Sequence, residues 1–231
     1  MKDFELMLAP MEGQTNSEFR ELCYKKGADS TFTEMARISA LVRGNKSTLE
    51  RINIPKPVPT YIQLIGLDEK ELNEFLKEFK PQKGFLGFNM NLGCPSQEMI
   101  QKGLGCALIK RISKVQKIVK TIKDYSYPVS IKLRLGMNKF EKEKKIYLNL
   151  IKNVDADFFI VHARHGKENN KNPADFDVYK ECVNTNKIII ANGDIKTKEQ
   201  IEYLKSIGIK GAMIGRAALE DPNIFTHLKQ N

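Results

Sequence analysis

Short apolar runs and longer amphipathic stretches alternate eight times along this chain of 231 residues. The short runs are rich in β-branched residues, as strands are, and the longer ones have the apolar spacing of helices. Eight strand-then-helix units are the number of a TIM (β/α)8 barrel, and an open, doubly wound sheet is the competing α/β architecture. The expected strands cover residues 5–9, 30–33, 58–64, 87–91, 129–133, 158–162, 187–191 and 211–214.

The stretches between these strands predict the helices of the barrel wall. In the first helix, over 17–26, the spacing places Phe19, Leu22 and Cys23 on the buried face. Asp68 is the expected N-cap of the second helix. The expected helices cover residues 17–26, 68–79, 141–152, 175–183, 197–207 and 216–228, with a further long helical region that ends near residue 123.

Polar residues and glycines gather where the expected strands end. The active site of a TIM barrel lies at the C-terminal ends of its strands, so this distribution favours the barrel over the open sheet. The residues at these ends are Pro10, Met11, Glu12, Gln63, Asn91, Cys94, Lys132, Arg134, His162, Asn192, Gly193, Asp194, Gly215 and Arg216. We see no linker, and we expect one domain over residues 1–231.

Charge and composition limit the class of partner. Thirty-eight Lys and Arg against 28 Asp and Glu give a net charge of +10, which suggests a polyanion such as RNA, although lysine-rich usage can also reflect compositional bias. No apolar run approaches a membrane span, and acidic residues stand where a signal peptide would begin, so we expect a cytoplasmic protein with no membrane partner. Four dispersed cysteines without a C-x-x-C pair argue against a metal site. A monomer is the favoured oligomeric state.

Glycines follow the last two expected strands, at Gly193 and at Gly215 beside Arg216. These two loops are the common phosphate site of TIM barrels, although the sequence 192–194 also suits a plain turn. Lys132, His162 and Arg164 stand within or just after apolar strands. Since interior charges are costly unless they are paired, Lys132 either points into the barrel mouth or lies on an outer face. His162 and Arg164 pose the same question, and His162 is either a satisfied core residue or a ligand contact.

Cys94 stands in a loop shaped by Gly93 and Pro95, just beyond the fourth expected strand. A thiol is mostly protonated at neutral pH, so it can donate a proton, and no Cys–His–Asn context favours a nucleophile instead. Cys23 and Cys182 fit apolar helix faces, whereas the role of Cys106 is ambiguous. The basic helical stretch 110–123 fits either a solvated surface or a contact with RNA phosphates.

Seven segments occur in an order that resembles the tRNA-dihydrouridine synthase family, and together they extend over essentially the whole chain. They are Ala9-Pro10-Met11-Glu12-Gly13, Thr33-Glu34-Met35, Asn91-Leu92-Gly93-Cys94-Pro95, Lys132-Leu133-Arg134-Leu135-Gly136, His162-Ala163-Arg164, Asn192-Gly193-Asp194-Ile195 and Gly215-Arg216-Ala217-Ala218-Leu219. The resemblance implies an FMN-containing TIM barrel that reduces a uridine of tRNA to 5,6-dihydrouridine with NADPH, or NADH, as reductant.

The resemblance also implies roles for individual residues. Cys94 corresponds to the proton donor, and Lys132 to a lysine beside the pyrimidine edge of the flavin. The other expected FMN contacts are Pro10, Met11, Glu12, Gln63, His162, Asn192, Gly193, Asp194, Gly215 and Arg216. We expect Asn91, Arg134 and Arg164 to contact the substrate, and no metal to take part. In the implied reaction, hydride reaches C6 of the uracil and the Cys94 thiol protonates C5.

The sequence also departs from the family pattern. Asn16 replaces a common aspartate and Cys106 a common alanine, and no C-terminal helical domain for tRNA binding is evident after the eighth strand. Two alternative functions therefore stay open. One is an FMN barrel that acts on a free pyrimidine or small enone, similar to dihydroorotate dehydrogenase, and the other is a non-catalytic tRNA-binding protein.

Overall fold

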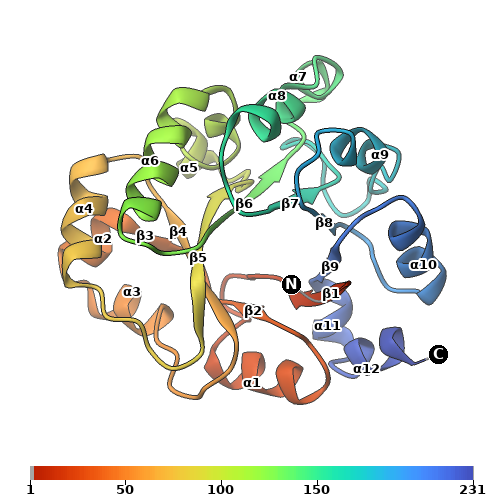
Figure 1. Ribbon diagram of the computed structural model, residues 1–231, viewed down its shortest axis with the longest axis horizontal. Coiled ribbons are helices and arrows are strands. Elements are labelled where there is room, and N and C mark those ends of the chain that lie inside the picture. The colour runs from red at the N-terminus through yellow and green to blue at the C-terminus, as the bar shows by residue number, and fades with distance from the viewer. Residues whose placement is uncertain (1–2, 231) are drawn as a thin grey trace.

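The computed structural model describes residues 3–230 and has the expected (β/α)8 architecture (Figure 1). All strands of the sheet run parallel, in the order β1-β9-β8-β7-β6-β5-β4-β2, and β3 extends the position of β2 by pairing with the far end of β4. The strands are β1 Glu5–Leu8, β2 Thr31–Phe32, β3 Ala36–Arg37, β4 Thr60–Ile65, β5 Phe85–Leu92, β6 Val129–Arg134, β7 Phe159–His162, β8 Ile189–Asn192 and β9 Gly211–Ile214.

The helices lie outside this ring of strands (Figure 1). They are α1 Ser17–Lys25, α2 Ile38–Val42, α3 Lys46–Arg51, α4 Glu69–Glu78, α5 Gln97–Gln101, the 3-10 helix η1 Gly105–Lys110, α6 Ile112–Asp124, α7 Lys139–Glu143, α8 Ile146–Asn153, α9 Val178–Val183, α10 Lys198–Ser206, α11 Arg216–Glu220 and α12 Ile224–Lys229. Within residues 3–230, no helix is both long and apolar enough to cross a membrane.

The ring closes between its first and second strands by a short contact. β1 pairs with β9 along its whole length, from Glu5 opposite Gly211 to Leu8 opposite Ile214. On its other side, an isolated bridge joins Met7 to Ser30, and the amide of Leu8 donates a hydrogen bond of 2.9 Å to the carbonyl of Ser30. The barrel is therefore nearly closed, with its weakest pairing at this position.

The alternation of side chains along each strand separates two environments. Along β6, Ile131 and Leu133 belong to the large core between sheet and helices, whereas Ser130, Lys132 and Arg134 take the opposite, interior positions. Part of the interior is filled by a small apolar cluster that consists of Met7, Ala9, Phe32, Phe158, Ile160, Ile190 and Met213. The polar residues that the sequence places late in the strands are thus carried to the upper end of the barrel.

The eight expected strands are confirmed with shifts of one or two residues, and Asp68 caps α4 as expected. Three expected helices are interrupted. The region before residue 124 divides into α5, η1 and α6, and the stretch 141–152 is broken at Lys145, whose φ is 52°. The expected helix over 216–228 is interrupted at Pro222, between α11 and α12, because proline has no amide proton and disfavours a helical residue before it.

The buried face of α1 also differs from its prediction. Leu22 is 41% exposed, and Arg20, at 3% exposed, is buried instead. The Arg20 guanidinium donates hydrogen bonds to the carbonyls of Thr15 and Asn53, at 2.9 and 2.8 Å. Because these backbone acceptors satisfy the buried cation, the apolar spacing alone could not locate the inner face of this helix.

Candidate active site

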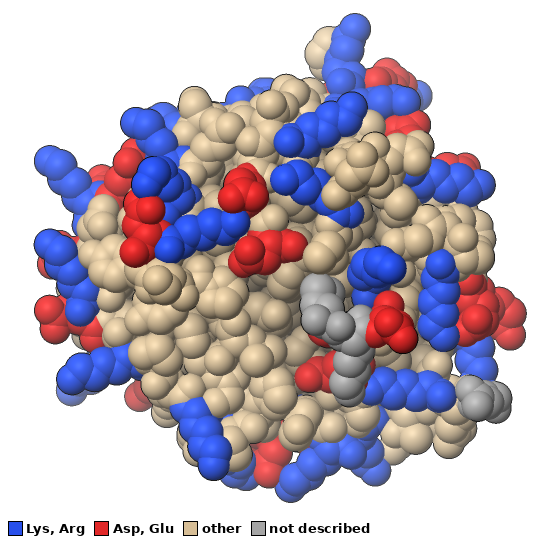
Figure 2. Space-filling view, viewed as in Figure 1, with Lys and Arg blue, Asp and Glu red and all other residues tan. Residues whose placement is uncertain are grey.

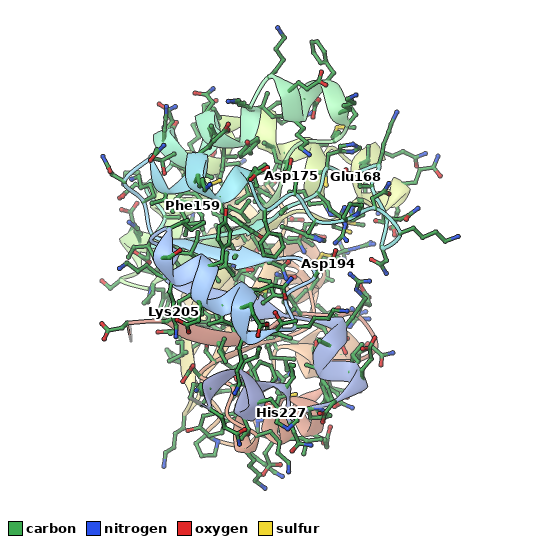
Figure 3. The ribbon with its side chains drawn as sticks, turned by 90° about the vertical axis from the view of Figure 1, so that its right-hand side faces the viewer. Phe159, Glu168, Asp175, Asp194, Lys205 and His227 are labelled. Atoms are coloured by element: carbon green, nitrogen blue, oxygen red, sulfur yellow. The ribbon has the colours of Figure 1, made fainter. Side chains whose placement is uncertain are left out.

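A cavity of about 650 Å³ opens at the C-terminal ends of the strands. Figure 3 shows Asp194, which follows β8, at one end of the barrel and Lys205, on α10, toward the other. The predicted site residues that line the cavity are Pro10, Met11, Glu12, Gln63, Asn91, Cys94, Lys132, Arg134, His162, Asn192, Gly193, Asp194, Gly215 and Arg216. Arg164 is the predicted site residue that does not line it.

The loop after β5 presents Cys94 to this cavity. Oδ1 of Asn91 accepts hydrogen bonds from the amides of Gly93 and Cys94, at 3.0 and 2.9 Å, and so fixes the turn of the loop. Sγ of Cys94 lies 3.4 Å from Oγ of Ser96, which caps α5. Of the four cysteines, Cys94 alone is partly exposed, and the other three are buried.

Cys106 and Gly105 support the Cys94 loop from below. The amide of Cys106 donates to the carbonyl of Cys94 at 3.0 Å, and Sγ of Cys106 lies 3.1 Å from the carbonyl of Gly93. Gly105 has a φ of 59°, and a Cβ on it would lie 2.3 Å from the carbonyl oxygen of Cys94, so glycine is required there. Burial raises the pKa of Cys106 to about 12. The ambiguity over this residue is therefore resolved in favour of a structural role.

Lys132 brings a cation into the cavity without an anion beside it. Within the described part of the chain, its ammonium group makes no ion pair or hydrogen bond. Burial, and then the neighbouring charge of Arg134, lower the pKa of Lys132 to about 8. Arg134 is fixed from behind, because its Nη1 donates to the carbonyls of His165 and Glu168 at 2.8 and 3.1 Å. An isolated interior cation of this kind suits an anionic ligand.

His162, Arg164, Asp194 and Arg216 form one network across the last three strands. Nη1 of Arg164 lies 3.3 Å from Nε2 of His162, and its Nη2 pairs with Oδ2 of Asp194. Oδ1 of Asp194 accepts from Nη2 of Arg216 at 2.6 Å. Arg164 is only 1% exposed and also donates to the carbonyl of Asn172. Arg164 therefore lies beneath the cavity and orients its neighbours from there.

This network determines the state of the imidazole. Since a guanidinium can only donate, Nε2 of His162 must accept, and the proton of the neutral ring is on Nδ1. Burial, followed by the charges of Lys132, Arg134 and Arg164, lowers the pKa of His162 to about 2. Gly193 packs against this ring, because a Cβ on it would lie 3.2 Å from Cδ2 of His162 at a φ of 122°. His162 is thus a neutral hydrogen-bond donor in the site.

Acidification below about pH 6.5 should destabilise the fold through His162. The unfolded chain binds a proton there with a pKa near 6.5, whereas the folded state does not, so stability falls as the pH decreases below 6.5. We expect a slope of about 1 kcal/mol per pH unit between pH 6.5 and 5, before carboxylates titrate. Urea denaturation of the parent and of His162→Gln should give diverging pH profiles, and parallel profiles would show that the folded imidazole accepts a proton.

Glu12 and Arg216 lie at the rim of the cavity. Glu12 is exposed and pairs with Nη1 of Arg51 at 2.6 Å, and the side chain of Arg216 is 45% exposed. Several exposed lysines pair with acidic side chains, and Figure 2 shows both signs of charge interleaved on one face. Much of the lysine surplus is therefore spread over a mixed surface. Within residues 3–230, no group of three or more His, Cys, Asp or Glu side chains could hold a metal ion.

Sequence reasoning missed several residues of the site. Asn170 and Lys196 also line the cavity, as does Met35, which belongs to the family segment 33–35 but was assigned no role. They come from loops, where periodicity gives no signal. Asn89 and Ser130 lie directly below the cavity and are fully buried. A signal for these two existed, because each is a polar residue two positions before a predicted site residue of the same strand, at Asn91 and Lys132.

Comparison with known proteins assigns the chain to a family. The model of the dihydrouridine synthase family matches residues 7–231. The chain belongs to the dihydrouridine synthase family. Similar sequences include a probable tRNA-dihydrouridine synthase of Aquifex aeolicus, which is 30% identical over 99% of this chain and 74% of the relative. The tRNA-dihydrouridine synthase B of Pseudomonas putida is also 30% identical, over 97% of this chain and 67% of the relative.

Solved structures agree with this dihydrouridine synthase fold at much lower identity. A DHODH of Eimeria tenella has a TM-score of 0.63 at 12% identity, over 97% of this chain and 79% of that one. N-(5'-phosphoribosyl)anthranilate isomerase of Pyrococcus furiosus has a TM-score of 0.56 at 14% identity, over 97% and 96%. Identities this low show the shared barrel alone. The tRNA-dihydrouridine synthase resemblance expected from the seven sequence segments is thereby confirmed at family level.

Proposed function

We propose that this chain is an FMN-dependent enzyme that reduces a uridine of tRNA to 5,6-dihydrouridine, with NADPH or NADH as reductant and Cys94 as proton donor. The observation that carries the proposal is the presence, in one cavity, of a partly exposed thiol at Cys94 and an unpartnered cation at Lys132. Family membership supports the reaction. The names of the relatives support tRNA as the substrate.

The residues of the cavity fit FMN, which has a planar ring, a polar ribityl chain and a phosphate. Lys132 supplies the cation that would stabilise an anionic ring, and its lack of a counterion leaves it free to do so. TIM barrels bind phosphate in the loops after their last two strands. In this cavity those loops follow β8 and β9 and contain Gly193, Gly215 and Arg216. No backbone hydrogen bond from the amides of Gly215 and Arg216 is present within residues 3–230, so these amides remain available to an anion.

The remaining contacts follow from position around the cavity. Pro10, Met11 and Glu12 would border the ring, and the neutral Nδ1–H of His162 would donate a hydrogen bond to it. Asn192 and Asp194 would lie along the ribityl chain. Asp194 would act mainly through Arg164 and Arg216, because both of its carboxylate oxygens are already hydrogen bonded.

Bound FMN, once reduced, would supply a hydride to C6 of the uracil. Cys94 would give its thiol proton to C5, and the side-chain oxygen Oδ1 of Asn91 would hold the loop so that the thiol faces the base. Arg134 would contact the substrate from the floor, since two backbone carbonyls orient its guanidinium. A uridine within folded tRNA must leave its stack to reach this cavity, and the net charge of +10 would assist binding of the phosphates.

Two measurements test the proposed function. Purified protein with FMN and NADPH should form dihydrouridine in unmodified tRNA, detected by mass spectrometry, and tRNA from cells without the protein should lack it. The affinity of the protein for tRNA should fall steeply as the salt concentration rises, because contacts with the tRNA phosphates release counterions. If the protein instead reduced a free pyrimidine, with no effect of salt, and did not reduce tRNA, the alternative function of a small-molecule reductase would be established.

Lys132→Met should weaken FMN binding by about 10- to 100-fold, because a charged hydrogen-bond partner of the ring is lost. The same change should leave the stability of the FMN-free protein equal or higher, since it removes an interior cation that has no counterion. Fluorescence titration with FMN and urea denaturation measure the two effects. Lys114→Met, on the exposed face of α6, is the control and should alter neither. Equal FMN affinity in the Lys132 variant and the parent would contradict this assignment.

A further inference from the structure

A series of hydrogen-bonded polar side chains, most of them buried, crosses three strands beneath the Cys94 loop. Nδ2 of Asn89 donates to Oγ of Ser130 at 2.8 Å, and Nε2 of Gln63 donates to Oδ1 of Asn89 at 2.7 Å. Nδ2 of Asn91 donates to Oε1 of Gln63 at 2.9 Å, and Oδ1 of Asn91 holds the amides of Gly93 and Cys94. Gln63, Asn89 and Ser130 are at most 1% exposed.

The direction of every bond in this series is fixed from its two ends. Backbone amides can only donate, so Asn91 must turn its oxygen to the Cys94 loop and its nitrogen to Gln63. Gln63 must then present oxygen to Asn91 and nitrogen to Asn89. Asn89 in turn presents nitrogen to Ser130, whose hydroxyl donates to the carbonyl of Phe88. No member can flip its amide without breaking bonds on both sides.

We propose that Asn89 and Ser130 are positioning residues for the protonation step, and this proposal rests on the proposed function of Cys94. They touch neither the thiol nor the cavity. Their effect passes through Gln63 and Asn91 to the amide of Cys94. The register of the sheet makes this possible, because Gln63 lies opposite Asn89 on β5 and Asn89 lies opposite Ser130 on β6.

The position of the series favours this role over a purely structural one. A barrel interior can be filled by apolar residues, as the small apolar cluster around Met7 demonstrates, whereas a buried series of polar side chains is costly unless every member is hydrogen bonded. In this series every side chain has a hydrogen-bond partner, and the last two hydrogen bonds go to the loop that carries the thiol. A displacement of about 1 Å at a reacting group can reduce a rate by about 10²-fold. These hydrogen bonds therefore control the position of the Cys94 thiol, on which the rate of protonation depends.

The test compares Asn89→Leu, Ser130→Ala and Asn89→Asp with the parent, each as the full chain saturated with FMN. Asn89→Leu should slow the oxidation of reduced flavin by tRNA about 10- to 100-fold, without slowing reduction by NADPH. Ser130→Ala removes one hydroxyl and should act in the same direction to a smaller extent, which keeps the test valid if the leucine variant does not fold. Asn89→Asp should recover most of the rate, because its carboxylate accepts from both Gln63 and Ser130.

A second readout follows the thiol itself, independently of tRNA. Iodoacetamide should alkylate Cys94 several-fold faster in Asn89→Leu than in the parent, since the loop loses its anchor, and Asn89→Asp should restore the parental rate. Mass spectrometry locates the label. The matched control is Thr60→Val on β4, which removes a buried hydroxyl 2.9 Å from that of Thr31 and should leave alkylation and turnover unchanged.

The proposal is overturned if folded Asn89→Leu and Ser130→Ala both match the parent in alkylation and turnover. An equal loss in Thr60→Val would also overturn it, because general destabilisation would then explain the result. The two readouts separate this proposal from the proposed function. A parent protein that modifies no tRNA would refute the function, while the alkylation rates would still decide whether Asn89 and Ser130 hold the Cys94 loop.

Discussion

Replacement of Cys94 by alanine is expected to slow the oxidation of reduced flavin by tRNA by about 10²- to 10⁴-fold, the usual contribution of a general acid. FMN binding and flavin reduction by NADPH should persist, because neither step needs a proton from the thiol. The loop itself should also survive, since its anchors are the backbone amides of Gly93 and Cys94, which alanine retains. Mixing the pre-reduced enzyme with unmodified tRNA and following flavin absorbance measures this single turnover.

Cys106→Ala is the matched control for the Cys94 variant. It removes a thiol that is fully buried beneath the same loop, together with its contact to the carbonyl of Gly93. We expect a loss of about 1 kcal/mol in stability, from the lost transfer free energy and a small cavity, and a nearly parental rate with tRNA. A parental rate in Cys94→Ala, or a stalled reaction in Cys106→Ala, would show that Cys94 is not the acid.

Asp194→Asn should reduce the free energy of unfolding by about 3 kcal/mol, because it leaves the buried guanidinium of Arg164 without an anion. Arg216 shares the same carboxylate but is largely exposed, so Arg216→Gln should cost less than about 1 kcal/mol. Urea denaturation of the two variants compares a buried and an exposed ion pair on one acid. Equal losses in the free energy of unfolding would mean that the burial of Arg164 does not determine the cost of removing its partner.

The carboxylate of Asp194 should also make the stability of the fold depend on pH in the acid range. Partial burial opposes its ionisation, but the hydrogen bonds and charges of Arg164, the Ala174 amide and Arg216 outweigh burial and hold the pKa of Asp194 below its usual value. A lowered carboxyl pKa stabilises the fold above the unfolded pKa, near 3.9, and this stabilisation is lost as the pH falls through the folded pKa. In Asp194→Asn the stability curve should therefore be flatter below pH 4 than in the parent.

The barrel and most of the cavity could be predicted because both depend on short-range patterns. Alternating strands and helices define the architecture, and the C-terminal ends of parallel strands must meet at one mouth. Lys132 is an example, since its place in an apolar strand allowed either the barrel mouth or an outer face, and the structure puts it at the cavity.

The rest depends on contacts between distant segments. Arg164 was named as a site residue from the segment 162–164, whereas Asn172 and Asp194, from two different loops, hold its guanidinium beneath the cavity. Arg20 was not expected inside because its acceptors are carbonyls of Thr15 and Asn53, which no side-chain pattern records. Such backbone acceptors can satisfy a buried cation, and only the folded structure shows where they are.

The pairing of β1 with β9 has a consequence for the order of events on the ribosome. Glu5 meets Gly211, so β1 must wait for the synthesis of β9, far along the chain, before its longer edge is covered. At about 5–20 residues per second, this interval is roughly 10–40 s. The other edge of β1 meets a short segment, Asp29 and Ser30, that is synthesised much earlier. Because Pro10 and Gly215 flank this late pairing, a nascent chain cannot acquire its complete cavity before translation has passed β9.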